Sequence, residues 1–286
     1  MIQLHRDHHR LQEVVYASFI TEVNAPKPGN VSRYAAGHDM TVDDFIHSAE
    51  LVSPILCDQR LNLGERVFQS VHITINTVGC NTNLGMVLLF APVVYTLQQS
   101  AVDSISALQC NLKKSLEQVD NRNAAQIFAA IRLARPGGLG STEKFDVNSA
   151  PDCGLLEAME AAQNRDLIAK QYVTGFHDIF TTGYHCLEGY FHRWKSVEWA
   201  TVACYLTFLA GFVDSHIERK HGPAVAREVK AKAASVAEQF KKNNQPDSAI
   251  DTLLAFDREF KNLNINPGTM ADLTAASVLI YSLDKL

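Results

Sequence analysis

The sequence predicts an all-α protein: a single compact multi-helix domain over residues 1–286 with a buried central helix. Apolar residues recur three and four positions apart along most of the chain, which is the spacing of one helix face. One segment, 84–97, is apolar almost all round and therefore predicts a helix covered on every side. Alternation of apolar and polar residues, the pattern of a half-buried strand, is scarce.

The helices are expected in the following order. The first has its apolar face at Leu11, Val14, Val15, Ser18 and Phe19. The second begins at Thr41, because Asp44 follows three residues later and completes a capping pair before an apolar run. A third stripe at 67–78 precedes the interior helix. Further periodic segments cover 103–118, 121–134, 153–163, 166–182, 196–217, 223–242, 247–262 and 270–285.

The glycines and prolines lie mostly between these segments, and none of the connections has the composition of a flexible linker. If the chain consisted of two halves, the segment 136–140 would be the boundary between them. We favour one domain, because the interior helix and the apolar run at 200–213 both need cover on all sides.

Composition narrows the class of protein. Hydrophobic residues make up 47% of the chain, which is ample for a large core. The net charge of −5 argues against a partner that is a nucleic acid. The longest apolar run is shorter than the roughly 20 residues of a membrane-spanning helix, so no membrane partner is expected. The six cysteines include no CxxC pair, and reduced thiols in the cytoplasm are the expectation.

The first segment with chemical character follows the first helix. Glu22 lies three residues beyond Phe19, so its carboxylate should point inward. Lys27 stands between two prolines that stiffen the loop, and Arg33 and Asp39 follow. A rigid loop with a cation beside carboxylates suits a phosphate and metal site. A proline-stiffened turn with solvated charges is the structural alternative.

The second segment opens the interior helix. Asn81 and Asn83 stand between glycines just before the apolar run. Asparagine caps helix N-termini, and the free N–H groups there attract anions. Capping accounts for one of the two asparagines, so a nucleotide contact is a reasonable expectation for the pair.

Two further segments lie in the second half of the chain. Asp214 is expected near the C-terminus of an apolar helix, where its charge opposes the helix dipole, with Arg219 and Lys220 close enough to neutralise it. Asn266 precedes a Pro-Gly pair, and Asp272 follows at the start of the last helix. Either salt bridges and capping or a bound metal and substrate would explain these charges.

Taken together and in this order, the four segments resemble the triphosphoribosyl-dephospho-CoA synthase family. The resemblance extends from about residue 22 to 283 and rests on Glu22, Val23, Pro26, Lys27, Pro28, Gly29, Val31, His38, Asp39 and Met40, then Asn81, Thr82 and Gly85, then Asp214 with Arg219, and finally Asn266, Pro267, Gly268, Ala271, Asp272 and Leu273.

The resemblance implies an all-helical transferase that uses ATP as substrate with Mg²⁺, releases adenine, and joins the triphosphoribosyl group to dephospho-CoA or a related cofactor precursor. It implies catalytic roles for Glu22, Asp39 and Asp214, and metal binding by these three with Asp272. The nucleotide would contact Lys27, Arg33, Asn81, Asn83, Arg219, Lys220 and Asn266. A homodimer is compatible with the sequence.

The resemblance breaks at one place. Where the family has a His-Lys pair, this chain has Asn83 and Leu84, so a phosphate-directed lysine is missing. We expect Leu84 to pack into the core and another cation to take the place of the lysine. An Mg-dependent N-ribosyl hydrolase and a non-catalytic nucleotide-binding protein remain alternative functions.

Overall fold

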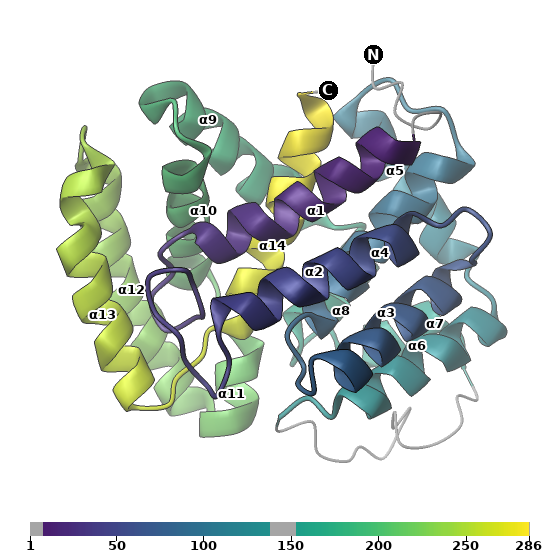
Figure 1. Ribbon diagram of the computed structural model, residues 1–286, viewed down its shortest axis with the longest axis horizontal. Helices are drawn as coiled ribbons and strands as arrows, with labels where there is room; N and C mark the ends of the chain where they lie inside the picture. Colours follow the sequence, from purple (N-terminus) through teal and green to yellow (C-terminus); the bar gives the residue numbers. More distant parts are fainter. Residues whose placement is uncertain (1–7, 138–152, 286) are drawn as a thin grey trace.

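The computed structural model describes residues 8–137 and 153–285, which form fourteen α-helices in one compact domain (Figure 1). The all-α prediction is therefore confirmed; within these residues there is no strand, only two isolated bridges in the loop after the first helix. The helices are α1 (His8–Asn24), α2 (Val42–Cys57), α3 (Leu63–Thr77), α4 (Leu84–Gln99), α5 (Ile105–Glu117), α6 (Asn121–Ala134), α7 (Leu155–Ala162), α8 (Leu167–Thr174), α9 (Tyr184–Trp194), α10 (Val197–Gly211), α11 (Ser215–His221), α12 (Pro223–Lys242), α13 (Ile250–Asn262) and α14 (Gly268–Asp284).

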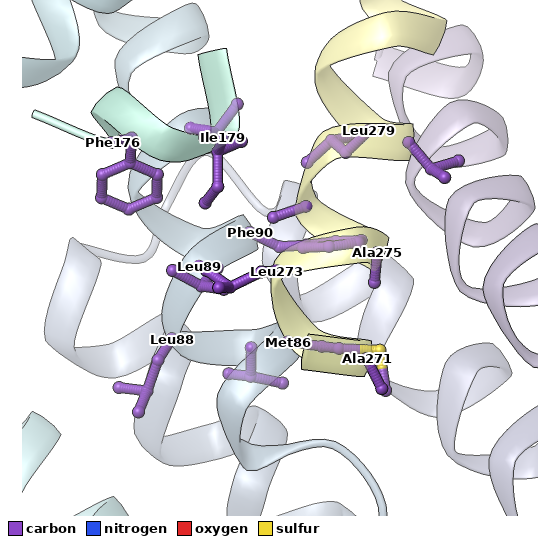
Figure 2. Close-up of a cluster of buried hydrophobic side chains, with 14 of the residues drawn as sticks. Met86, Leu88, Leu89, Phe90, Phe176, Ile179, Ala271, Leu273, Ala275 and Leu279 are labelled. Atoms are coloured by element: carbon purple, nitrogen blue, oxygen red, sulfur yellow. The ribbon is translucent and has the colours of Figure 1, made fainter. Parts of the chain in front are cut away.

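Two helices, α4 and α14, form the centre of the domain. Both are apolar on nearly every face, and α14 contacts α1, α4 and α10. Figure 2 shows their side chains meeting, with Leu89 and Phe90 of α4 beside Leu273 and Leu279 of α14. The prediction of a buried central helix at 84–97 is thus confirmed, and α14 is a second one.

A proline inside α4 ties this helix to α8. Pro92 has no N–H group, so the carbonyl oxygen of Leu88 lacks its usual partner four residues later. The hydroxyl of Tyr172, on α8, donates to that oxygen at 2.6 Å instead. A buried backbone acceptor is thereby satisfied, and the last turn of α8 is held beside the first half of α4.

The predicted segment 196–217 is two helices rather than one. The apolar pattern runs on past Gly211, but α10 ends there and α11 begins at Ser215, bent by 52° from it. Asp214 causes the new start, because its Oδ1 accepts a hydrogen bond from the N–H of Ile217 at 2.9 Å. The expectation that Asp214 sits at a helix C-terminus is wrong; it caps an N-terminus, where its charge is favourable.

The predicted segment 166–182 is also divided. Helix α8 ends at Thr174 and is capped by Gly175, whose φ of 63° lies in the left-handed region that favours glycine, and a π-helical turn, Ile179–Gly183, follows. Of the proposed boundary at 136–140, residues 138–140 lie outside the described ranges.

Among the described helices none alone is long and apolar enough to cross a membrane, although α10 and α11 as a bent pair reach that length and composition.

Candidate functional site

A cavity opens where the start of α4, α8 and α14 meet the end of α1. Its volume is about 430 Å³. Helix α8 contacts both α4 and α14, and α11 contacts α14, so segments distant in sequence lie side by side around it (Figure 1). Its polar lining includes Glu22, Asn30, Asn81, Thr82, Asn83, Arg165, Asp166, His216, Arg219, Asn266, Thr269 and Asp272.

The first turn of α4 faces this cavity. Asn81 accepts a hydrogen bond from the N–H of Leu84 at 3.1 Å, so it caps the helix as predicted. Asn83 does not cap; its amide donates to the hydroxyl of Thr74 at 3.1 Å, and that part of the prediction is wrong. The hydroxyl of Thr82 is buried in the cavity wall and has no hydrogen-bond partner in the described part of the chain.

The starts of α8 and α14 lie on the same cavity. The carboxylate of Asp166 caps α8, accepting from the N–H groups of Ile168 and Ala169 at 2.9 and 3.1 Å. Helix α14 has no side-chain cap at Pro267, but the N–H of Met270 donates to Asp214 at 3.0 Å. Three helices therefore direct the positive ends of their dipoles toward one place, an arrangement that favours anions.

Two arginines line the cavity. The guanidinium of Arg219 lies 2.6 Å from Asp166, and its Nε is buried without a partner among the described residues. Arg165, next to the cap of α8, is the second. Sequence reasoning found Arg219 but missed Arg165 and Asp166. The available signal was the N-cap position of Asp166 at the start of the predicted segment 166–182.

Two carboxylates, Glu22 and Asp272, lie on the cavity as predicted. Only 1% of the Glu22 surface is exposed, and this burial raises the pKa of its carboxyl group. Burial, and then the negative charge of Glu22, raise the pKa of Asp272 well above its usual range. Gly85 leaves room for Asp272, because a Cβ at Gly85 would overlap the Asp272 carboxylate.

Lys27 is buried but does not line the cavity. Its Nζ donates to the carbonyl oxygens of Glu22, Ala25 and Val31 at 2.7, 3.3 and 3.2 Å. It also lies 3.2 Å from Glu22 Oε1, although neither carboxylate oxygen of Glu22 has a hydrogen-bond donor in the described residues. Lys27 therefore does not share the cavity with Asn81 and Asn83, because the carbonyls of its own loop surround its ammonium group.

Other predicted residues also lie apart from the cavity. Asp39 is exposed, and Arg33 pairs with Glu198 at the surface. Lys220 is exposed, with Asn264 at 3.4 Å as its hydrogen-bond partner. Asp214 uses both oxygens to cap α11 and α14, and burial raises its pKa to about 6. The predicted convergence of four carboxylates on one metal is thus not found, and the described residues contain no group of three or more His, Cys, Asp and Glu able to hold one.

Asn266 does line the cavity and is fixed by its neighbour. The side-chain amide of Asn30 donates to Asn266 Oδ1 at 2.9 Å, which joins the loop after α1 to the loop before α14. His216 is a further lining residue that sequence reasoning missed. Burial, followed by the positive charge of Arg219, lowers its pKa to about 4, so its imidazole is neutral near pH 7.

Comparison with known proteins decides the family. The model of the CitG family, ATP:dephospho-CoA triphosphoribosyl transferase, matches residues 8–286. This chain belongs to the CitG family. A search of curated proteins found no match. A crystal structure of a candidate triphosphoribosyl-dephospho-CoA synthase from Archaeoglobus fulgidus matches with a TM-score of 0.63 and 22% identity, over 84% of this chain and 98% of that one, which shows a shared fold.

The family to which this chain belongs consists of transferases that use ATP, as the sequence predicted. Within this CitG-family chain, Leu84 is buried to 8% exposure among the core residues, as expected. Leu84 also borders the cavity. Four cations of the motif segments could replace a lysine there: Lys27, Arg33, Arg219 and Lys220. Of these, Arg219 alone lines the cavity in the described part of the chain, and Arg165 lines it as well.

Proposed function

We propose that this cavity is where the chain transfers the triphosphoribosyl group of ATP to dephospho-CoA. The observation that supports the proposal is the meeting of three helix N-termini, two arginines and three carboxylates (Glu22, Asp166 and Asp272) on one cavity. A polyphosphate needs cations and N–H donors, whereas a ribose that loses its base needs negative charge. Both kinds of group are present within the same walls.

The triphosphate would lie against the arginines and the helix starts. Arginine binds phosphate oxygens in pairs, and Arg219 is held in place by Asp166. The unpartnered hydroxyl of Thr82 would gain an acceptor from a phosphate oxygen. Among the predicted nucleotide contacts we retain Asn81, Asn83, Arg219 and Asn266, which line the cavity.

The ribose would lie beside Glu22 and Asp272. As the bond from C1′ to the adenine nitrogen breaks, its electron pair leaves with adenine and C1′ becomes cationic. Carboxylates fixed in a buried site stabilise such developing positive charge. A hydroxyl oxygen of dephospho-CoA then bonds to C1′ and gives up its proton, for which a carboxylate or the neutral His216 is a suitable acceptor.

Magnesium fits the same two carboxylates. Glu22 Oε1 is paired with Lys27 at 3.2 Å, whereas the buried Oε2 has no hydrogen-bond donor within the described residues, which leaves it available to a hard cation. Mg²⁺ typically takes one or two protein carboxylates and completes its shell with phosphate oxygens and water, so Glu22 and Asp272 are sufficient. When bound, the ion would neutralise charge on the triphosphate.

Three further predictions concern the compartment, the oligomeric state and the domain organisation of the chain. Cys57, Cys80, Cys110, Cys186 and Cys204 are free thiols, which supports a reducing compartment such as the cytoplasm. A homodimer stays a prediction. We also propose that residues 1–286 form one domain, which is supported by the family match over 8–286.

An adenine-release assay tests the proposal. The chain is incubated with ATP and Mg²⁺, with and without dephospho-CoA, and adenine and product masses are measured. We expect adenine only with the acceptor, together with a product that contains both substrates less adenine. Adenine and ribose triphosphate without acceptor would instead show a hydrolase. ATP binding without adenine release would show a nucleotide-binding protein.

A further inference from the structure

The lining of the cavity includes apolar side chains as well as charged groups. We call the following residues the apolar wall: Leu84 and Leu88 of α4, Phe128 and Ile131 of α6, and Ala158 and Ala162 of α7. Leu88 is fixed by the bond from Tyr172 to its carbonyl, and Phe128 is buried to 2% exposure. The wall is therefore built from side chains that form no hydrogen bonds.

The two kinds of lining residue match the two parts of ATP on either side of the bond that breaks. One product of that cleavage is a highly charged triphosphoribosyl group, and the other is an uncharged purine. We propose that the apolar wall is the binding surface for the adenine base of ATP; this rests on the proposed placement of the triphosphate at Arg219 and the helix starts. The wall thus selects the leaving group, while the charged side of the cavity holds the part that is transferred.

The shape and polarity of the wall favour a purine over the pantetheine arm of dephospho-CoA. The two alanines on one face of α7 offer only methyl groups, so a flat ring can lie against the helix beside Phe128. The faces of a purine are apolar and need no partners. The pantetheine arm has two amides and a hydroxyl, and each would lose hydrogen bonds to water against this wall without gaining others.

Two fragments of ATP test the two sides separately. Free adenine and inorganic tripolyphosphate are each titrated as inhibitors of the transfer reaction at varied ATP. The wall variant is Ala162→Phe, which fills the space at a half-buried position. Its matched control is Ala107→Phe, at a half-buried helical alanine that does not line the cavity. Arg219→Gln alters the charged side.

We expect adenine to compete with ATP in the wild type. Ala162→Phe should weaken adenine inhibition on the order of ten-fold and leave tripolyphosphate inhibition and the KM for dephospho-CoA nearly unchanged. Arg219→Gln should weaken tripolyphosphate inhibition and leave adenine inhibition nearly unchanged. If Arg219→Gln has no effect on tripolyphosphate inhibition, the proposed triphosphate placement fails, whatever the result with adenine.

Three results would overturn the adenine assignment. They are the absence of adenine inhibition in the wild type, unchanged adenine inhibition in Ala162→Phe, and a rise in the KM for dephospho-CoA alone, which would place the acceptor at the wall. If Ala162→Phe melts at a lower temperature than its control, the same measurements are made on Ala162→Leu, which adds less volume and must shift adenine inhibition in the same direction.

Discussion

The carboxylate of Asp166 serves two helices at once, because one oxygen caps α8 and the other lies 2.6 Å from the guanidinium of Arg219 on α11. The ion pair is mostly sheltered, with the Arg219 side chain 19% exposed. A long side chain that would otherwise sample many rotamers is thereby held at the edge of the cavity. Because the Arg219 side chain is already held in one conformation before ATP binds, the entropic cost of binding is reduced.

The variant Asp166→Asn separates the two roles. Asparagine keeps a carbonyl oxygen that caps α8, so the melting temperature should change little. Its amide has no charge to hold Arg219, and we expect the KM for ATP to rise about five- to ten-fold with a smaller change in kcat. Steady-state kinetics and thermal melts measure both. The control is Asp120→Asn, which alters the same kind of cap at α6, away from the cavity. An unchanged KM with a lowered melting temperature would show that Asp166 is only a cap.

Gly85→Ala tests the position of Asp272. The added methyl would overlap the Asp272 carboxylate, which must rotate away, while the helix gains an alanine. We expect stability to change little but kcat/KM to fall at least about ten-fold, because a small displacement of a reacting group is costly. Gly189→Ala, in an exposed part of α9 with open space around it, should leave activity unchanged. Full activity in Gly85→Ala would mean that Asp272 does not act from its observed position.

Lys27→Met tests whether this lysine supports the fold rather than a phosphate. Glu22 would lose its buried ionic partner, and three carbonyl oxygens would lose a donor. We expect the free energy of unfolding to fall by about 3–5 kcal/mol in urea titrations. Affinity for tripolyphosphate without Mg²⁺ should change less than about three-fold. The exposed Lys220→Met should alter stability by less than about 0.5 kcal/mol. A stable Lys27→Met variant with lost tripolyphosphate binding would contradict this account.

Sequence periodicity predicted those parts of the site that lie on regular apolar faces. The inward direction of Glu22 follows from the stripe that contains Phe19, and the cover around α4 follows from its apolar residues on every face. Both are confirmed, since burial is a property that periodicity reports directly.

The other features of the site depend on which side chains contact one another, and the periodicity of a sequence carries no information about these contacts. The apolar run through 212–213 hides the break that Asp214 creates by capping α11. Lys27 lies in a loop rich in proline, a context typical of the surface, yet three backbone carbonyls hold it inside. Asp166 and Arg219 are 53 positions apart and meet only because α8 and α11 start at the same cavity.

The pH dependence of stability tests the environment of His216. Burial and the positive charges of Arg219, Lys220, His38 and His221 lower the pKa of His216 from 6.5 to about 4. Between these values the unfolded chain binds a proton that the folded chain does not. His216 therefore contributes stability above pH 6.5 that is lost as the pH falls toward 4.

We compare wild type with His216→Gln by urea unfolding across this pH range. The wild type should lose more unfolding free energy on acidification than the variant, because glutamine does not titrate. The opposing change from Asp214, whose pKa is raised to about 6, is present in both proteins and cancels in the difference. A difference that does not vary with pH would show that His216 is not buried as described.

The central claim is that ATP binds where the starts of α4, α8 and α14 meet, and a crystal structure of this chain with ATP and Mg²⁺ tests it most directly. We predict the triphosphate within hydrogen-bonding distance of Arg219 and Thr82, and the ribose beside Glu22 and Asp272. ATP bound at another surface, or in this cavity with its phosphates against the apolar wall, would contradict the account.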